Sequence, residues 1–407
     1  MKEIDYNKII NYLLIGYAFA LPISKAGVNI FETLILLTWI IQGNWRYKYN
    51  LYKKNLLFIG FFMLVLFSVI SIPWASDTVF ALDYIAKYRH FLIILPIYSS
   101  LDTKYIKLIF SAFLSGMFIS EVMSYGIFFE LWKYKNILPR DPSPFMSHVD
   151  YSVYLAFTSI LLLTRLMDET EENIKLKFLY AAFFASSAIN LFINGGRTGQ
   201  VTFVVLIFIS VLMSFKSKLT AFFISMVLII STLVVAYNYS PNFNHKFNHA
   251  SNGIKAMIYD NNYKSDGFSQ RVSLWIVGVD NFKDNFLYGK GIGNDTADIE
   301  YYAQKRGFDP KFLSEFGDNH NMFLIIGLQL GIVGLIAMIL IFYSIFRLSF
   351  ISNVNKILSL TFIVGFFLWS LGNTTFHTMN AMVFFALFAG LFNKISHMEI
   401  STNKKIH

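Results

Sequence analysis

Long apolar runs recur along the whole chain, and most of them are close to the length of a membrane-crossing helix. Such a helix needs ~20 mostly apolar residues, because its backbone must satisfy its own hydrogen bonds in hydrocarbon. The runs therefore predict an all-α integral membrane protein with about twelve transmembrane helices. The predicted helices lie near residues 8–24, 27–43, 54–75, 80–101, 103–130, 147–167, 174–194, 199–215, 218–237, 320–347, 355–372 and 377–395.

The composition agrees with a membrane protein and excludes several kinds of site. Of the 407 residues, 55% are hydrophobic and only 14% are charged, whereas soluble domains carry about 25% charged residues. The chain has no cysteine, so disulfides, thiolate metal sites and cysteine nucleophiles are excluded together. A net charge of +9 would suggest a nucleic-acid partner in a soluble protein. In a membrane protein the position of these charges indicates topology, and we expect no nucleic-acid partner.

The basic residues indicate the orientation, because short cytoplasmic loops are rich in Lys and Arg. With the N-terminus inside, 18 of the 34 Lys and Arg residues fall in cytoplasmic segments and only five in short outer loops. Those five are Lys25, Lys133, Lys135, Arg140 and Arg197. We therefore expect both termini in the cytoplasm. The first apolar run leads into the second without a small-residue cleavage site, which favours a retained helix over a signal peptide.

One connection is much longer than the others and divides the chain into three parts. We expect helices one to nine in residues 1–237, one long outer loop in residues 238–319, and helices ten to twelve with a short cytoplasmic tail in residues 320–407. A connection of this length inside a compact protein is usually functional.

The long loop contains both polar and helix-like stretches. It opens with an Asn-rich segment, where Asn and Pro argue against a helix that would place His245 and His249 on one face. Two helix-like runs follow, at residues 269–284 and 295–306, and a glycine cluster at residues 289–293 separates them.

Arg197 lies in the turn Gly195-Gly196-Arg197-Thr198-Gly199 between two predicted helices. Glycines let a backbone approach a ligand and leave its N–H groups bare, and a guanidinium can bind phosphate oxygens with two parallel hydrogen bonds. The alternative is a tight hairpin whose arginine reaches the lipid headgroups. Arg271 has a similar alternative, because a surface arginine near a tryptophan, here Trp275, is often an interfacial anchor.

His320 lies where the long loop enters the membrane again, at the predicted start of a helix. Partial positive charge and desolvation both favour a neutral imidazole there, and a neutral imidazole is a general base near neutral pH. Asp318 or Asn319 could orient the ring, and either could instead cap the helix. The downstream glycines Gly327, Gly331 and Gly334 are typical of close helix packing.

Several further polar residues lie on the outer side and are secondary candidates, because ionisable groups at the membrane are costly. Lys87 and Arg89 lie in one predicted helix, where Asp83 four residues earlier could simply pair with Lys87. His148 and His377 lie at helix starts, where caps are common. Asp298 and Glu300 are the only carboxylates that resemble a metal-binding pair, and we expect no metal site.

The order of these features resembles the O-antigen ligase family and its relatives, the O-antigen polymerases. The resemblance covers most of the chain and uses the loop arginine in Arg271-Val272-Ser273-Leu274-Trp275, the turn arginine, the cluster Gly289, Gly291 and Gly293, and His320-Asn321-x-x-Leu324. In that family two arginines and a histidine form the functional set. The positions that match here are Arg197, Arg271 and His320.

The resemblance implies a glycosyl transfer at the periplasmic face of a bacterial inner membrane, without a metal or other cofactor. The donor would be a glycan on undecaprenyl diphosphate, and the acceptor the lipid A core. Arg197 and Arg271 would bind the diphosphate, while His320 would deprotonate or orient the acceptor hydroxyl. A polymerase that joins lipid-linked repeat units is the nearest alternative, and the long single loop favours a ligase. A flippase for the same lipids is a second alternative, although we find no inverted repeat.

Overall fold

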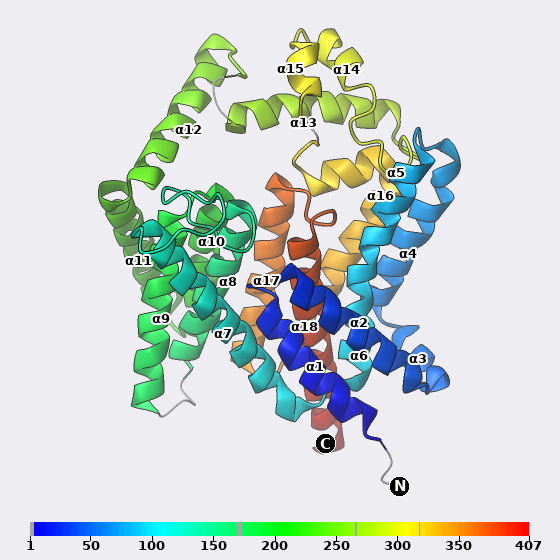
Figure 1. The fold of residues 1–407 in the computed structure, drawn as a ribbon, viewed down its shortest axis with the longest axis vertical. Coiled ribbons are helices and arrows are strands. Elements are labelled where there is room, and N and C mark those ends of the chain that lie inside the picture. Colours follow the sequence, from blue (N-terminus) through cyan, green and yellow to red (C-terminus); the bar gives the residue numbers. More distant parts are fainter. Residues whose placement is uncertain (1–3, 169–172, 265–266, 317, 407) are drawn as a thin grey trace.

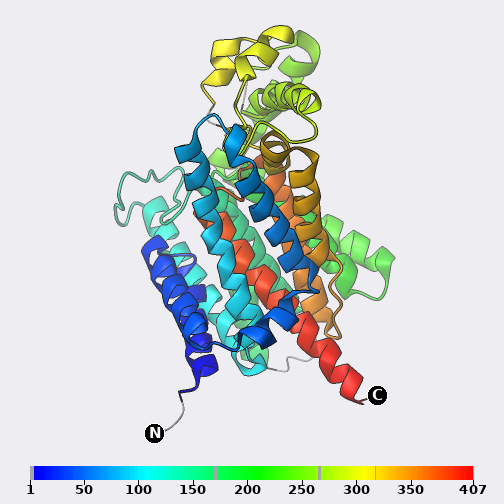
Figure 2. The same ribbon diagram turned by 90° about the vertical axis from the view of Figure 1, so that its right-hand side faces the viewer.

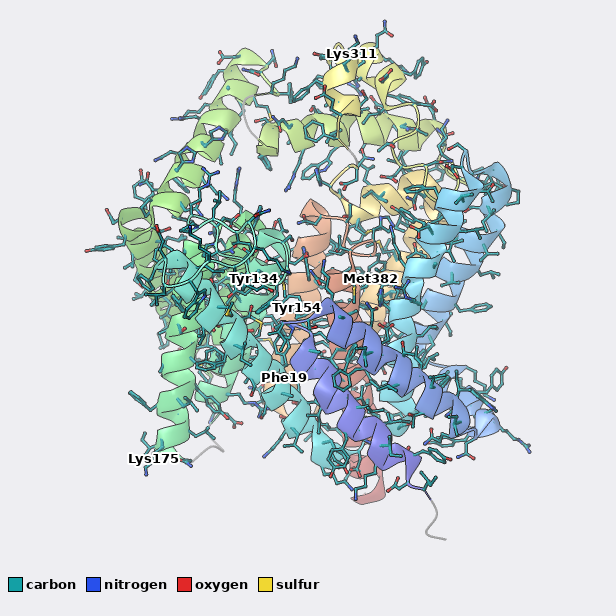
Figure 3. All side chains as sticks on the ribbon, viewed as in Figure 1. Phe19, Tyr134, Tyr154, Lys175, Lys311 and Met382 are labelled. Carbon is teal, nitrogen blue, oxygen red and sulfur yellow. The ribbon has the colours of Figure 1, made fainter. Side chains whose placement is uncertain are left out.

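The computed structural model describes residues 4–168, 173–264, 267–316 and 318–406, and every regular element in these ranges is a helix. Long helices run side by side in one bundle, and further helices cover one of its ends (Figure 1). Both chain termini lie at the opposite end of the bundle (Figures 1 and 2). Tyr154 and Met382 lie in the middle of the bundle, whereas Lys175 and Lys311 lie at opposite ends of the molecule (Figure 3).

In the described part of the chain, eight helices are long and apolar enough to cross a membrane. The number rises to nine if the bent pair α2 (Lys25–Ile41) and α3 (Trp45–Tyr52) counts as one span. The chain is therefore an all-helical, multi-pass membrane protein. The eight helices are α7 (Thr103–Phe128), α8 (His148–Leu166), α9 (Ile174–Ile193), α10 (Arg197–Ser214), α11 (Lys218–Tyr239), α16 (Met322–Phe346), α17 (Asn353–Gly372) and α18 (Met379–Ile406).

The remaining predicted windows are also helical, but their helices are shorter than expected. Helices α1 (Tyr6–Ala20) and α4 (Leu56–Ile70) have 15 residues each. Fifteen residues rise only about 22 Å, which is less than the hydrocarbon thickness of a bilayer.

The prediction of one continuous helix over residues 80–101 is wrong. This window is divided among α5 (Thr78–Lys87), the 3-10 helix η2 (Tyr88–Ile93) and α6 (Ile94–Ser100). Next to it a second short 3-10 helix, η1 (Ile72–Trp74), follows α4. In η2, His90 Nδ1 lies 2.8 Å from Glu32 Oε2 of α2 in the interior. Such tertiary contacts favour a local break that hydropathy alone does not reveal.

Helix α16 is kinked at Gly331, where φ is 63° and ψ is −155°. The sequence suggested only close packing for this glycine, and that interpretation is incomplete. A positive φ suits glycine, and the kink leaves backbone groups of α16 without partners in the helix. The loop after α13 supplies the partners: Lys290 N–H donates to Leu328 O at 2.7 Å, Gly291 N–H to Gln329 O at 2.9 Å, and Ile332 N–H to Phe286 O at 2.8 Å. The glycine cluster thus docks the loop onto the bundle.

Helices α8 and α18 form the centre of the bundle and are its most buried spans. Helix α8 packs against α9, α10 and α17, whereas α18 packs against α6 and η2. The rings of Tyr154 and Phe384 lie 4.6 Å apart between the two helices. The Tyr154 hydroxyl also donates to Asn380 O at 2.9 Å. This core fixes the start of α10 and the α17–α18 connection at the covered end.

The covering layer, here named the cap, consists of residues 241–264 and 267–316 and contains four helices within these ranges. They are α12 (Pro241–Asp260), α13 (Gly267–Asp284), α14 (Ile299–Lys305) and α15 (Pro310–Ser314). Helix α13 lies across the end of the bundle (Figure 1), which confirms the helix-like run at 269–284. The run at 295–306 is helical only over α14. Buried apolar side chains, among them Leu274, Val277 and Leu313, join α13, α14 and α15.

The interpretation of the Asn-rich segment as non-helical is wrong, because this segment forms α12. Pro241 occupies the first turn, where its fixed φ suits a helix and no hydrogen bond is lost. Ser240 caps the helix, since its hydroxyl accepts from Phe243 N–H at 3.2 Å. His245 and His249 therefore do share a face, and their ring centroids lie 6.0 Å apart.

Candidate functional site

The glycine-rich turn connects α9 to α10 and brings Arg197 to the covered end of α10. The sequence suggested bare backbone N–H groups at this turn, and that suggestion is wrong for its glycines. Gly195 N–H donates to Asp141 Oδ1 at 3.0 Å, and Gly196 N–H donates to Asn194 Oδ1 at 2.9 Å. Gly199 N–H donates to Ser152 Oγ at 3.2 Å. The glycines of the turn are thus tied to their surroundings, and Arg197 follows them at the start of α10.

A cavity of about 380 Å³ lies between the cap and the bundle, and both predicted arginines line it. Arg197 comes from α10 and Arg271 from α13, so residues that are far apart in the sequence meet here. Residues of the cap and of the end of α17 border the cavity. Its wall also includes His148, Lys246, Phe268, Trp275, Leu368 and Gly372.

The described residues of this cavity's wall carry more positive than negative charge. Arg197, Arg271 and Lys246 all line it, and its described lining residues include no carboxylate. Lys246 Nζ donates to Gly195 O at 2.7 Å. Burial lowers the pKa of Lys246, and the nearby Arg197 and Arg140 lower it further, although Asp141 opposes this shift. An anion in the cavity would relieve the repulsion among these cations.

Asp141 provides a nearby negative charge and organises one side of the site. His148 Nδ1 lies 2.9 Å from Asp141 Oδ2. Burial opposes ionisation of Asp141, but the hydrogen bond and charge of His148 outweigh it, and the pKa of Asp141 lies below its ordinary value. His148, a secondary candidate, is therefore the wall residue that Asp141 holds in place.

His320 does not line the cavity but lies in the segment beside it. Trp275 of the cavity wall donates from Nε1 to Asn319 O at 3.0 Å. Asp318 Oδ1 lies 2.9 Å from His320 Nδ1 and accepts from the His320 backbone N–H at 2.6 Å. Asp318 is thus the residue that orients the ring, which answers a question that the sequence left open.

The expectation that His320 begins a helix is wrong. Helix α16 begins at Met322, and Asn321 caps it by accepting from Leu324 N–H at 3.1 Å. His320 has a φ of 48°, in the left-handed region. Asn319 neither orients the ring nor caps the helix: its side chain is buried and donates to Asp295 O at 2.7 Å. The histidine is therefore held on a short, well-bonded segment between cap and bundle.

Burial opposes ionisation of Asp318, but the hydrogen bonds and charge of His320 outweigh it. The nearby Arg271 acts in the same direction, so the pKa of Asp318 lies below its ordinary value. The carboxylate is therefore ionised at neutral pH. Arg271, Asp318 and His320 thus belong to one electrostatic neighbourhood.

The other secondary candidates do not line this cavity. Lys87 Nζ lies 3.6 Å from Asp83 Oδ2, the intrahelical pair that the spacing suggested. Arg89 donates from Nη1 to Ala86 O at 3.4 Å. His377 is buried beside Tyr84, whose hydroxyl forms a short hydrogen bond with its Nδ1. Asp298 forms an ion pair with Lys290, with 2.6 Å between Oδ2 and Nζ.

Sequence reasoning missed two residues of this region. Lys246 was overlooked because α12 was not expected to be a helix, although Ser240-Pro241 is a recognisable helix start. Asp295 was overlooked because nothing in its local sequence marks it. It is buried in the cap, where Gln329 Nε2 donates to its Oδ1 at 2.9 Å, and burial raises its pKa to about 6.

Comparison with known proteins points to the segment of the chain that contains the two arginines and His320. Residues 181–339 match the family model for O-antigen ligase, Wzy_C. The matched segment runs from α9 into α16 and contains Arg197, Arg271 and His320. No curated protein matches the chain. The family covers ligases and polymerases, which are membrane enzymes that transfer glycans from lipid-linked substrates. By this match, residues 181–339 are similar to the O-antigen ligase domain of the Wzy_C family.

Proposed function

We propose that the chain is an O-antigen ligase. It transfers a glycan from undecaprenyl diphosphate to the lipid A core oligosaccharide at the periplasmic face of the bacterial inner membrane. The observation that carries this proposal is the cavity beneath the cap, which Arg197 and Arg271 line together. Both arginines lie inside the segment that matches the O-antigen ligase family.

The proposed topology has twelve membrane-embedded helical segments with both termini in the cytoplasm. Residues 1–237 supply the first nine, residues 238–319 form the periplasmic part, and residues 320–407 supply the last three and a short tail. The position of both termini at the end opposite the cap supports this arrangement (Figure 2). The excess of Lys and Arg in the segments assigned to the cytoplasm supports it independently.

The proposed reaction is an inverting glycosyl transfer that uses no metal. The acceptor hydroxyl attacks the anomeric carbon from the face opposite the diphosphate, a new C–O bond forms, and the bond to the diphosphate breaks with its electron pair. Arg197 and Arg271 stabilise the negative charge that develops on the leaving group. Nε2 of His320 takes the hydroxyl proton, while Asp318 holds Nδ1 and stabilises the resulting imidazolium.

Reconstitution of the purified chain with a lipid-linked donor and a lipid A core acceptor tests the proposal. A ligase moves the glycan to lipid A core and releases undecaprenyl diphosphate, and it does so in excess chelator. Glycan units joined to each other, with lipid A core unchanged, indicate a polymerase. Donor that crosses the bilayer intact, with no glycan transferred, indicates a flippase. A requirement for added magnesium or manganese would contradict the metal-free mechanism.

A further inference from the structure

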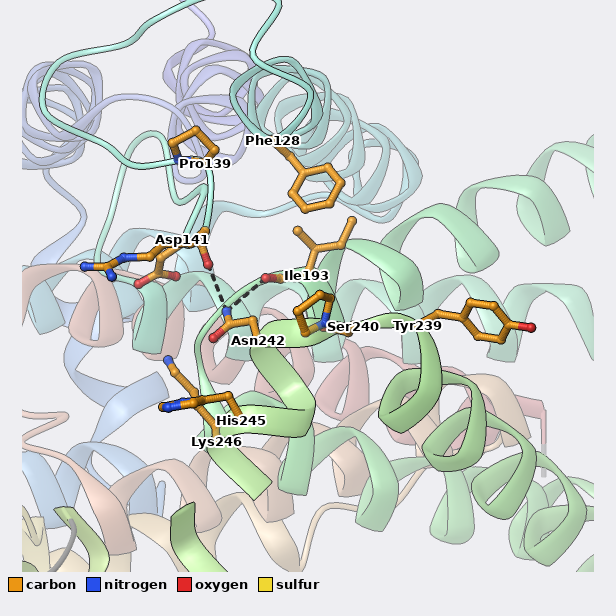
Figure 4. A pocket seen from close by; sticks show the side chains of 11 residues that line it. Phe128, Pro139, Asp141, Ile193, Tyr239, Ser240, Asn242, His245 and Lys246 are labelled. Carbon is orange, nitrogen blue, oxygen red and sulfur yellow. Dashed lines mark hydrogen bonds between the residues drawn. The ribbon is translucent and has the colours of Figure 1, made fainter. Parts of the chain in front are cut away.

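A second and larger cavity, of about 710 Å³, lies beside the one that contains the arginines (Figure 4). It is bordered by the segment before α8, the end of α9, and the junction of α11 and α12. Asn242 closes one side, since its Nδ2 donates to Arg140 O at 2.9 Å and to Ile193 O at 3.1 Å. Both basic and apolar side chains line it. The basic ones are Arg140, His245 and Lys246, and the apolar ones include Phe128, Ile193 and Tyr239.

The two cavities and an apolar groove lie next to one another as a series of hollows. Lys246 lines both cavities. Ile193, Tyr239 and Ser240 line both the larger cavity and a groove of about 340 Å³ between α9 and α11. The rest of the groove is lined by Ala185, Ala188, Ile189 and Phe192 of α9 and by Ser231, Thr232, Val235 and Ala236 of α11.

The groove opens on the outside of the bundle. Helices α9 and α11 are among the least buried of the candidate spans. Helix α10 packs against both of them. Ile189 and Val235 on its sides are exposed, and in a multi-pass membrane protein such apolar residues face lipid.

The number of positively charged lining residues increases from the groove through the larger cavity to the smaller cavity. The groove has no charged lining residue, the larger cavity has Arg140 and Lys246, and the smaller cavity has Lys246, Arg197 and Arg271. Asp141 is the only carboxylate among the described lining residues, and it already binds His148 and Gly195 N–H. A matching ligand has a long hydrocarbon chain at one end and a multiply charged anion at the other.

We propose that the groove between α9 and α11 holds the polyprenyl chain of the donor, and that Arg140 and Lys246 receive its diphosphate beside Arg197. The inference rests on the proposed function and adds where the lipid-linked substrate lies. A single flexible isoprenoid chain suits one narrow groove between two helices, whereas lipid A carries several acyl chains. The donor therefore reaches the arginines laterally from the membrane, and the acceptor approaches from elsewhere.

Binding of labelled undecaprenyl diphosphate to the purified full chain tests the groove without any need for turnover. Val235 lines the groove and its neighbour Val234 does not, although the two side chains are almost equally exposed, at 55% and 53%. Val235→Trp fills the groove and should weaken binding roughly tenfold or more, because apolar contact area is lost. Val234→Trp is the matched control and should bind as the unaltered chain does. Equal binding by both variants would overturn the assignment of the groove.

A short-chain probe separates the groove from the basic cavity. Val235→Trp should leave binding of geranyl diphosphate unchanged, because its two isoprene units do not need the groove. Lys246→Gln and Arg140→Gln should each weaken both probes roughly tenfold, the usual scale for a lost charge-assisted contact. Lys255→Gln on the exposed side of α12 is the control. If Lys246→Gln and Arg140→Gln bind both probes normally, the basic cavity does not receive the diphosphate.

These outcomes are distinguishable from failure of the proposed function. If the unaltered chain does not bind undecaprenyl diphosphate at all, both proposals are wrong. If it binds and Val235→Trp binds equally well, only the groove is wrong. If the groove variant loses binding but the protein joins donor units to each other, the groove stands and the ligase assignment is wrong.

Discussion

At the scale of single residues, the site contains two arginines whose planar shape matters as much as their charge. A guanidinium can bind a phosphate with two parallel hydrogen bonds, and an ammonium cannot. Arg197→Lys and Arg271→Lys should therefore weaken donor binding and reduce glycan transfer strongly, although the charge is kept. Lys255→Arg on the cap surface is a suitable control, because it also exchanges the two basic residue types but lies outside the cavity. Near-normal transfer by both lysine variants would indicate that charge alone is needed.

His320 should behave differently from the arginines, because a base is needed for the chemical step and not for donor binding. Positioned general bases typically contribute ~10²–10⁴-fold, so His320→Ala should reduce the rate of transfer by that order. Donor binding should be almost unchanged. Asp318→Asn keeps an oxygen that can accept from Nδ1, and its loss of rate should be smaller than that of His320→Ala. If His320→Ala binds donor poorly but transfers normally at saturation, His320 belongs to the binding site instead.

Asp295 should make stability depend on pH. Burial raises its pKa to about 6 in the fold from an ordinary value of 3.8, so the fold favours the protonated form. The stabilisation by that proton is complete below pH 3.8 and is lost as the pH rises through about 6. Asp295→Asn has no charge to bury, so at pH 8 its free energy of unfolding should exceed that of the unaltered chain by up to roughly 3 kcal/mol, and it should unfold at a higher temperature.

The difference between Asp295→Asn and the unaltered chain should shrink towards pH 4, and thermal unfolding in detergent at the two pH values measures it. Asp298→Asn is the control, since Asp298 is half exposed and pairs with Lys290 at the surface. Asn319 bonds to the backbone oxygen of Asp295, so the substitution leaves that contact in place. A pH-independent difference would contradict the role assigned to burial.

At the scale of elements, hydropathy predicted the long helices well and the interruptions poorly. The breaks in residues 80–101 and at Gly331 depend on tertiary partners: Glu32 opposite His90, and the loop backbone opposite Leu328 and Gln329. No window of local sequence contains those partners. Helix α12 is a different case, because its Ser240-Pro241 start is itself a local signal of a helix and outweighs the many Asn residues that follow.

The contact between α8 and α10 offers a test of how Arg197 is positioned. A methyl group at Gly199 would collide with the Ser152 backbone, whereas one at Gly267 would meet no atom within 4 Å. Gly199→Ala should therefore destabilise the protein by about 1–3 kcal/mol, the usual cost of overpacking. Gly267→Ala should change thermal stability little. Similar unfolding temperatures for Gly199→Ala and the unaltered chain would mean that α8 and α10 can separate at no cost.

At the scale of the whole molecule, the sequence predicted a multi-pass helical membrane protein but not how the cap lies over the bundle. The local sequence marks Arg197 and Arg271 as two separate candidates, and only the family resemblance predicts that they act together. Their common cavity depends on α13 lying across the bundle and on the loop that docks at the α16 kink (Figure 1). Those contacts join segments that are far apart in the sequence. The local sequence of one segment does not predict the other as its partner.

The final prediction concerns the side of the membrane on which the cap lies. Eighteen Lys and Arg residues against five in short loops favour cytoplasmic termini, and the cap lies at the other end of the bundle. Alkaline phosphatase, which is active only in the periplasm, should be active when fused after Asp260, between α12 and α13. The same reporter fused after Met167, at the end of α8, should be inactive. The reverse pattern would place Arg197, Arg271 and His320 on the cytoplasmic side, away from a periplasmic lipid-linked donor, and the proposed reaction could not occur there.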